Sequence, residues 1–466
     1  MFSWSVGYLE DAAARAFRFL GLHPGADFDA YASAALTRTS LRQSRWLLDR
    51  LARAHLIEPA GPGRYSMHDL LRAYAADQVA DQDSEQERRA ALTRLFDHFL
   101  AAAAAAAGTL FPADPDQPAL PPPACPLPPV TNPAAALAWL DAQRSTLVAV
   151  AAHAADHGWP GHAIGLAATI FRYLDAGHVA EAAAVHGHAR RAAVRSGDRT
   201  AEAAALTMLG VADAAQGRLR QATSYLEQAL ALCRRDGDRI GEARALSNLG
   251  MAEYCHGRYR QSAQCHQAAL AICLKVGDHA GQARELHALS VIDLRQGRYE
   301  QAAGQLRRSL ALFHDAGLGS GEAHVLGSLG ELELRQGRYA QAGGQLRRSL
   351  ELARELGSRS GQAKALACLG TAELQRGSGR LAIGYLRQSL ALHHYAGNRS
   401  GQAEALNGLG EALLATSQIR QASAWQAAGD SGKARSHWQA ALARYTDLGT
   451  PEAELVRAQI AGAAEG

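Results

Sequence analysis

The 466-residue sequence lacks a long uninterrupted apolar run. Its alanine stretch, Ala101 to Ala107, is far shorter than the roughly 20 apolar residues that a membrane-spanning helix needs. No charged segment followed by an apolar run begins the chain, so we expect no signal peptide. The six cysteines fall mostly at helical positions without an even disulfide framework, which favours a reducing compartment. These absences predict a soluble cytoplasmic protein.

The chain also has little net charge. It carries 48 lysines and arginines against 45 aspartates and glutamates, which leaves a net charge of +3 at pH 7. This balance gives no whole-chain electrostatic case for binding nucleic acid. Lysine is scarce among the cations, so any basic site must be built mainly from arginine.

Motifs that bind phosphate, hold a metal or supply a nucleophile are missing as well. A phosphate-binding loop needs Gly-x-x-x-x-Gly-Lys-Ser/Thr, whereas the pair Gly432-Lys433 is followed by alanine inside a helical pattern. Cys255, Cys265 and Cys273 share one repeat, but they lack the closely spaced ligand pairs of zinc sites. No nucleophile with its base and orienting group can be assigned. We therefore predict no enzyme, no metal and no cofactor.

The chain does have a repeat with a period of 40 residues. The six residues Gln305 to Leu310 return unchanged 40 residues later. A leucine column runs through Leu230, Leu270, Leu310, Leu350 and Leu390, and a glycine column through Gly210, Gly250, Gly330, Gly370 and Gly410, with Ser290 in its gap. Such a period over more than half the chain indicates a stacked array, in which no repeat buries its apolar face alone.

Each repeat has the pattern of two helices. The glycine of a Leu-x-x-Leu-Gly segment is followed after seven residues by a turn glycine and after twelve by a small residue, as in Gly210, Gly217 and Ala222. This pattern resembles tetratricopeptide repeats lengthened to 40 residues, while HEAT-like helix pairs share only the length. We expect the small columns to let two helices approach closely, with a second leucine column around them: Leu226, Leu306, Leu346 and Leu386.

One position departs from the tetratricopeptide pattern. The residue three after the column glycine, aromatic in that consensus, is acidic here: Asp213, Glu253, Asp293, Glu333 and Glu373. We expect these acids to pair with arginines of neighbouring repeats.

Residues 1–80 follow a different pattern. Helical spacing over residues 9–20, about 27–36 and 41–51 precedes two strand-like segments that flank Gly61-Pro62-Gly63. Three helices and a small hairpin indicate a winged helix, and the arginines Arg38, Arg42 and Arg45 suggest that its third helix reads DNA. The favoured alternative is an ordinary solvated helix face, because the turn carries Arg64 as its one cation.

The segment Met67-His68-Asp69-Leu70-Leu71 follows the hairpin. It resembles the winged-helix end of the NB-ARC-type signalling ATPases among the AfsR-like actinobacterial regulators. The resemblance implies that His68 contacts the phosphates of bound ADP, with an ATPase core upstream of Met1 or on a separate P-loop ATPase. The alternative is that His68-Asp69 only starts a helix, where the dipole favours an acid. Residues 138–149, with Gln143 in place of a glutamate, likewise resemble the segment that precedes the repeats in these regulators.

These patterns divide the chain into six predicted segments. They are a winged-helix domain at 1–80, a connecting helix at 81–111, a proline-rich linker at 112–133, two leading helices at 134–160, a tetratricopeptide solenoid at 161–449 and a C-terminal cap at 450–466. The linker holds ten of the fifteen prolines, which favours an extended spacer. A 12-residue insertion near 416–428 interrupts the last repeat. The predicted fold class is all-α, a small winged helix followed by an α-solenoid.

The first helices of such an array line a groove, and their predicted groove positions are basic. The residues are Arg244, Arg284, Arg295, His324, Arg335 and Lys364. This strip predicts an acidic peptide or C-terminal carboxylate as the ligand, although exposed arginines can also serve only to solubilise a helix. We predict a regulatory interaction protein whose solenoid binds a protein or peptide. The alternative is a DNA-binding transcriptional regulator that uses the solenoid as its sensor.

Overall fold

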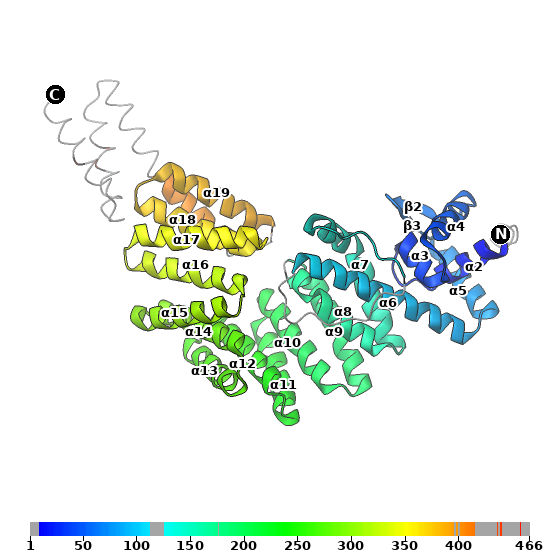
Figure 1. The fold of residues 1–466 in the computed structure, drawn as a ribbon, viewed down its shortest axis with the longest axis horizontal. Coiled ribbons are helices and arrows are strands. Elements are labelled where there is room, and N and C mark those ends of the chain that lie inside the picture. The colour runs from blue at the N-terminus through cyan, green and yellow to red at the C-terminus, as the bar shows by residue number, and fades with distance from the viewer. Residues whose placement is uncertain are drawn as a thin grey trace, which may run out of the picture. The chain divides into compact units, whose positions relative to one another are not determined.

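The computed structural model describes residues 9–111, 125–175, 177–395, 398, 401–414, 436, 439 and 457. Most of these residues are helical, and the chain divides into two compact units, Met1–Cys255 and His256–Gly466 (Figure 1). The predicted C-terminal cap apart from residue 457, the insertion near 416–428 and the prolines of 112–124 lie outside the described residues.

The first part of unit 1 combines helices with a small antiparallel sheet. Along the chain come α2 (Asp11–Leu20), β1 (Asp27–Asp29), α3 (Ala30–Thr37), α4 (Leu41–Arg53), β2 (Glu58–Gly61), β3 (Arg64–Ser66) and α5 (Asp69–Gln82). Strand β3 lies between β1 and β2. Residues 27–29, expected to begin a helix, form a strand that pairs with β3, and α3 begins only after the Asp29 carboxylate, which caps it. This carboxylate accepts hydrogen bonds from the backbone N–H groups of Tyr31 and Ala32.

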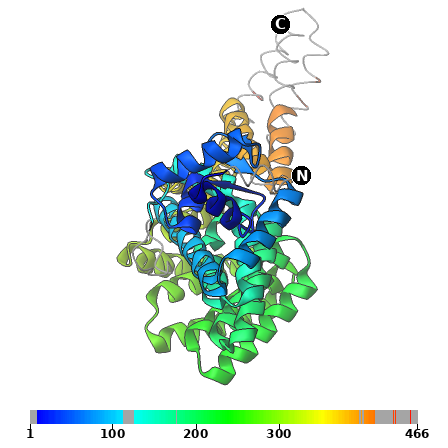
Figure 2. The ribbon, with the colours of Figure 1, turned by 90° about the vertical axis from the view of Figure 1, so that its right-hand side faces the viewer.

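Longer helices continue unit 1. They are α6 (Glu85–Leu110), α7 (Pro133–His157), α8 (Pro160–Asp175) and α9 (Val179–Ser196). Helix α6 packs against α3 (Figures 1 and 2), and one apolar core extends from Ala13 in α2 to Ala212 in α10. The N-terminal helices therefore share their core with the first repeats and are not an isolated module.

The repeats follow as helix pairs with the predicted period. Unit 1 ends with α10 (Arg199–Ala215), α11 (Leu219–Asp236) and α12 (Arg239–Cys255), and unit 2 contains α13 (Tyr259–Val276), α14 (His279–Arg295), α15 (Tyr299–Asp315), α16 (Gly319–Arg335), α17 (Tyr339–Glu355), α18 (Arg359–Gln375) and α19 (Gly379–Tyr395). Residues 401–414 are also helical. Glycines with positive φ end α9, α11 and α13, and the aspartate after each glycine caps the next helix.

Three of the column glycines pack directly on the second leucine column. A Cβ at Gly210, Gly330 or Gly370 would lie 2.6, 2.5 or 2.5 Å from the Cγ of Leu226, Leu346 or Leu386. These leucines are at most 2% exposed. The prediction that small residues let paired helices approach is therefore confirmed. Leu310, in the first leucine column, is only half-buried.

The acidic column pairs with arginine, but within a repeat. Arg218 Nε donates to Asp213 Oδ1 at 3.0 Å, and Arg298 Nε donates to Asp293 Oδ1 at 2.8 Å. Each arginine follows a turn glycine of positive φ, which directs its side chain back over the preceding helix. The expected pairing between neighbouring repeats is therefore wrong for these acids.

Candidate partner-binding surface

The first helices of unit 2 bring polar side chains together on one face. Helix α16 packs against both α14 and α18. His287 Nε2 on α14 lies 2.8 Å from Ser328 Oγ on α16, so a hydrogen bond joins two successive repeats. We call the residues Arg284, His287, His324, Ser328, Arg335, Lys364 and Cys368 the first-helix face.

Three basic groups on this face influence one another. Loss of contact with water, together with the charges of Lys364 and His324, lowers the pKa of His287 to about 3. The pKa of His324 is also lowered, first by desolvation and then by Lys364. Lys364 on α18 therefore acts electrostatically on both α14 and α16. An anion at this place would be attracted by the charge of Lys364, because the two histidines, with their lowered pKa values, are neutral at pH 7.

Other predicted groove residues carry their own partners. Arg335 NH2 lies 3.1 Å from Glu331 Oε1, and Arg284 NH2 lies 3.6 Å from Asp278 Oδ2. The side chains of Arg284, Arg295, His324, Arg335 and Lys364 are exposed. Arg244 belongs to α12 of unit 1, so it is not among the first-helix face residues of unit 2.

Sequence reasoning did not single out His287, Ser328 or Cys368. His287 follows the predicted groove residue Arg284 by three residues, which is about one helical turn. The 40-residue repeat therefore already indicated that His287 lies on the same helix face. Desolvation, reinforced by nearby acids such as Glu331, raises the pKa of Cys368 to about 12. This thiol is therefore protonated and unreactive at neutral pH.

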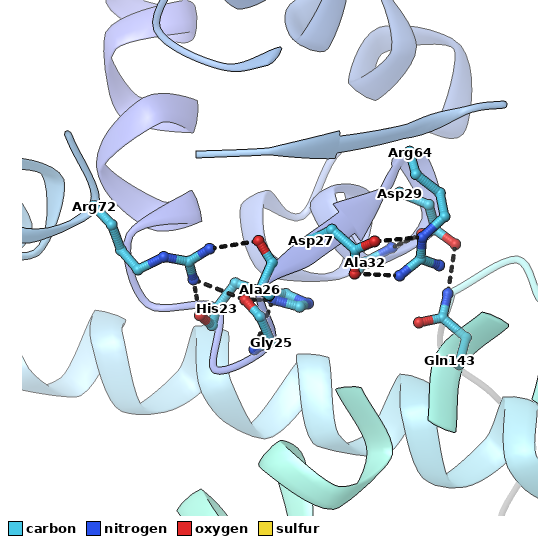
Figure 3. Close-up of polar contacts among 9 residues, drawn as sticks. All are labelled: His23, Gly25, Ala26, Asp27, Asp29, Ala32, Arg64, Arg72 and Gln143. Carbon is cyan, nitrogen blue, oxygen red and sulfur yellow. Dashed lines mark hydrogen bonds and ion pairs between the residues drawn. The ribbon is translucent and has the colours of Figure 1, made fainter. Parts of the chain in front are cut away.

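A polar junction fastens the β1 loop of unit 1 to its surroundings (Figure 3). The Arg72 guanidinium on α5 donates to the carbonyl oxygens of His23, Gly25 and Ala26 at 2.6, 2.8 and 2.9 Å. Gln143 on α7 is buried, and its Nε2 donates to Asp29 Oδ2 at 3.2 Å. Gln143, which the sequence marked only as a replacement for glutamate, thus links α7 to Asp29, the residue that caps α3.

The segment at His68 begins a helix. His68 is exposed and is the N-cap of α5, where its Nδ1 accepts a hydrogen bond from the backbone N–H of Leu70 at 3.3 Å. This geometry fits the structural alternative considered for the segment. A nucleotide contact of His68 stays a prediction.

The arginines considered for DNA contact do not all lie on one helix. Arg42 and Arg45 are exposed on α4. Arg38 was assigned to the third helix, which is wrong, because it is the left-handed residue that ends α3, with φ of 57°. Arg64 is bound to Asp27, with its Nε 2.9 Å from Oδ2.

No group of three or more His, Cys, Asp or Glu side chains among the described residues is arranged to hold a metal ion. In the same part of the chain, no helix combines the length and apolar character needed to cross a bilayer. The six cysteines form no disulfide.

Comparison with known proteins agrees with the repeat geometry. Two family models, both described as tetratricopeptide repeat, match residues 203–235 and 241–314. These residues span α10 to α15, with their glycine turns and paired helices. The chain is therefore a tetratricopeptide-repeat protein.

Its relatives are regulators. Regulatory protein AfsR of Streptomyces griseus is 36% identical over 237 residues, which are 50% of this chain and 24% of AfsR. AfsR of Streptomyces coelicolor is 40% identical over 152 residues, or 32% of this chain and 15% of AfsR. The chain is thus an AfsR-like tetratricopeptide-repeat protein that spans about a quarter of the Streptomyces griseus relative.

Two solved structures align with much of this chain at low sequence identity. A signal transduction ATPase with numerous domains and a tetratricopeptide repeat sensor, from Pyrococcus horikoshii, aligns with 98% of this chain and 66% of its own, at 14% identity and a TM-score of 0.44. A Rap protein complexed with Competence and Sporulation Factor aligns with 74% of this chain and 91% of its own, at 12% identity and a TM-score of 0.46.

Proposed function

We propose that this chain is a regulatory interaction protein that binds an acidic peptide or protein segment on its first-helix face. The observations that support the proposal are the hydrogen bond between His287 and Ser328 and the packing of α16 against α18, because they favour one polar face from three successive first helices, with Arg335 and Lys364 as its cations. A side-chain or terminal carboxylate placed there gains charge-assisted hydrogen bonds. Its similarity to AfsR supports a regulatory role.

The ion pairs already on the face do not oppose such a ligand strongly. Exposed pairs such as Arg335–Glu331 contribute about 0–1 kcal/mol, so an incoming carboxylate can replace the existing partner. Lys364 makes no ion pair with any described residue, so its charge is available to a ligand. The His287–Ser328 hydrogen bond fixes α14 and α16 relative to each other at this face.

Binding of acidic peptides to the full chain tests this proposal. Fluorescence anisotropy would compare glutamate-rich peptides that have free C-terminal carboxylates with glutamine-rich peptides of equal length. We expect Lys364→Glu and Arg335→Glu to weaken binding of the acidic peptides about tenfold or more. Arg307→Glu and Arg347→Glu, which change the charge equally at exposed positions of second helices, should have little effect. Equal losses in both pairs would show general charge attraction and contradict the proposed site.

The order of elements from α2 to β3 supports a second proposal, that residues 11–66 are a winged-helix module that contacts DNA through α4. Arg42 and Arg45 are exposed there, although Arg64 is engaged with Asp27. In filter binding across a salt series, Arg42→Ala with Arg45→Ala should reduce the salt slope by about 0.9 for each lost phosphate contact. Arg260→Ala, at an exposed position of α13, serves as the control. Binding that is absent, or unchanged in the double variant, would overturn the DNA proposal.

The similarity to ATPase regulators also suggests a protein partner. We propose that His68 contacts ADP held by a separate P-loop ATPase. Because Nδ1 of His68 accepts from Leu70, the proton of the neutral ring is on Nε2, which is then the donor that a phosphate oxygen requires. ADP-dependent capture of a P-loop ATPase should be lost in both His68→Ala and His68→Asn. Because asparagine preserves the helix cap, capture retained in His68→Asn would mean that the cap alone matters.

A further inference from the structure

Unit 1 contains a cavity of about 620 Å³ between α9, α10 and α11. This volume lies within the roughly 300–1,000 Å³ of small-molecule sites. Its walls include Gly187, Arg190, Arg191, Arg195, Arg218 and Tyr225. None of these residues belongs to the first-helix face, so the cavity is a separate candidate site.

Two substitutions in the repeat pattern open this cavity. Gly187 occupies the position that is Glu227, Gln267, Arg307, Arg347 and Arg387 in the following second helices, and a Cβ built on it would meet no atom within 4 Å. Arg190 occupies the position of the first leucine column, which continues as Leu230 and Leu270. Helix α9 therefore has open space where later repeats carry a long side chain. It has a guanidinium where the next repeats carry a leucine.

The cavity has an excess of positive charge. Four arginines line it against one acid, Asp213, which Arg218 already binds. Arg191 and Arg195 reach Asp156 at 3.4 and 3.1 Å, but these partners are exposed and such pairs are weak. Arg190 makes no ion pair with a described residue, and its guanidinium carbon lies 5.8 Å from the centre of the Tyr225 ring. A ligand with two negative charges would offset this excess.

We propose that the cavity binds a small phosphate monoester that carries an apolar or aromatic group. The planar guanidinium fork matches phosphate oxygens in pairs, so Arg190 can hold the phosphate from α9, and Arg218, whose Nε is bound to Asp213, lies beside it in the cavity wall. Val194, which is 54% exposed, and the Tyr225 ring provide an apolar wall for the rest of the ligand. The apolar base is Leu209, which is 7% exposed.

Phenyl phosphate is the probe for this site, with calorimetric titration of the full chain as the measurement. We expect phenyl phosphate to bind, benzoate to bind more weakly because it has one charge, and phenol to show no binding. Absence of phenyl phosphate binding at millimolar concentration would overturn the proposal. Benzoate binding as tight as that of phenyl phosphate would overturn the preference for phosphate.

Two variants restore the residues of the next repeat and close the cavity. Gly187→Glu fills the open position with an acid, and Arg190→Leu restores the leucine column. Each should weaken phenyl phosphate binding roughly tenfold to a hundredfold, the effect of losing charge-assisted hydrogen bonds. The thermal unfolding midpoint should stay close to that of the parent chain, since both residues occur at these repeat positions. The matched controls are Gly304→Glu, at an open glycine of α15, and Arg220→Leu, at an exposed position of α11. Equal losses in the controls, or none in the cavity variants, would refute the site.

Discussion

His266 Nδ1 on α13 lies 2.7 Å from Glu285 Oε2 on α14, and both side chains are 3% exposed. His266 stands in the second leucine column, which is Leu226, Leu306, Leu346 and Leu386 in other repeats. Glu285 stands where other repeats have Ala205, Ala245, Val325, Ala365 and Ala405. A hydrogen-bonded polar pair thus takes the place of an apolar contact between the second helix of one repeat and the first helix of the next.

We expect His266→Leu and Glu285→Ala each to lower the free energy of unfolding by about 3–5 kcal/mol, because each leaves a buried polar partner alone. The double variant restores the residues of the other repeats and should be neutral or stabilising by about 1–4 kcal/mol. Urea unfolding of all four proteins measures the coupling between the two sites. Additive effects of the single substitutions would contradict a coupled pair.

Gly330 lies at a close approach of the paired helices α16 and α17. Because a Cβ there would lie 2.5 Å from Leu346 Cγ, we expect Gly330→Ala to destabilise the protein by about 1–3 kcal/mol through overpacking. The matched control is Gly304→Ala, in which the new methyl group meets no atom within 4 Å. That substitution should stabilise α15 by roughly 0.5–1 kcal/mol. Denaturant midpoints of both variants test the contrast, and a neutral Gly330→Ala would mean that the helices can move apart freely.

Leu306 and Leu310, one from each leucine column, should differ in their contributions to stability. Leu306 is fully buried, so Leu306→Ala should lower the free energy of unfolding by about 2–5 kcal/mol. Leu310 is half-buried, so the same truncation there should have a smaller effect. Urea unfolding of both variants measures the difference. Equal losses of stability would show that Leu310 contributes as much to the core as Leu306.

The periodic part of the fold could be read from the sequence, and the exceptions to the period could not. Gly330 and Leu346 are fixed by a spacing that every repeat shares, so their contact could be predicted. The partner of Asp293 depends on how the turn glycine directs Arg298, which spacing alone does not show. Strand β1 has three residues and is defined by pairing with β3, far away in sequence, so local helical spacing misled the prediction.

The candidate sites could be predicted from the sequence only where they follow the repeat period. His324 and Lys364 occupy one repeat position and could be assigned to one face. The cavity beside Arg190 depends on what is missing at Gly187, and an absent side chain becomes a space only once the neighbouring helices are in place.

His287 gives the protein an acid-sensitive contact. Desolvation, aided by Lys364 and His324, lowers its pKa from 6.5 to about 3. The unfolded chain takes up this proton near pH 6.5, whereas the folded chain does so only near pH 3, so the unfolded state binds more protons between these values. Stability contributed by neutral His287 is therefore complete above pH 6.5 and is lost as the pH falls through this window.

We expect His287→Gln to reduce the loss of stability between about pH 7 and pH 4.5, since glutamine does not titrate and can still hydrogen-bond Ser328. Urea unfolding of both proteins at the two pH values isolates the histidine, because the other titrating groups are common to both chains. The variant should have the smaller difference between its two free energies of unfolding. An identical difference would mean that the His287 ring becomes charged without cost in the folded state, and that the surrounding helices admit water to it.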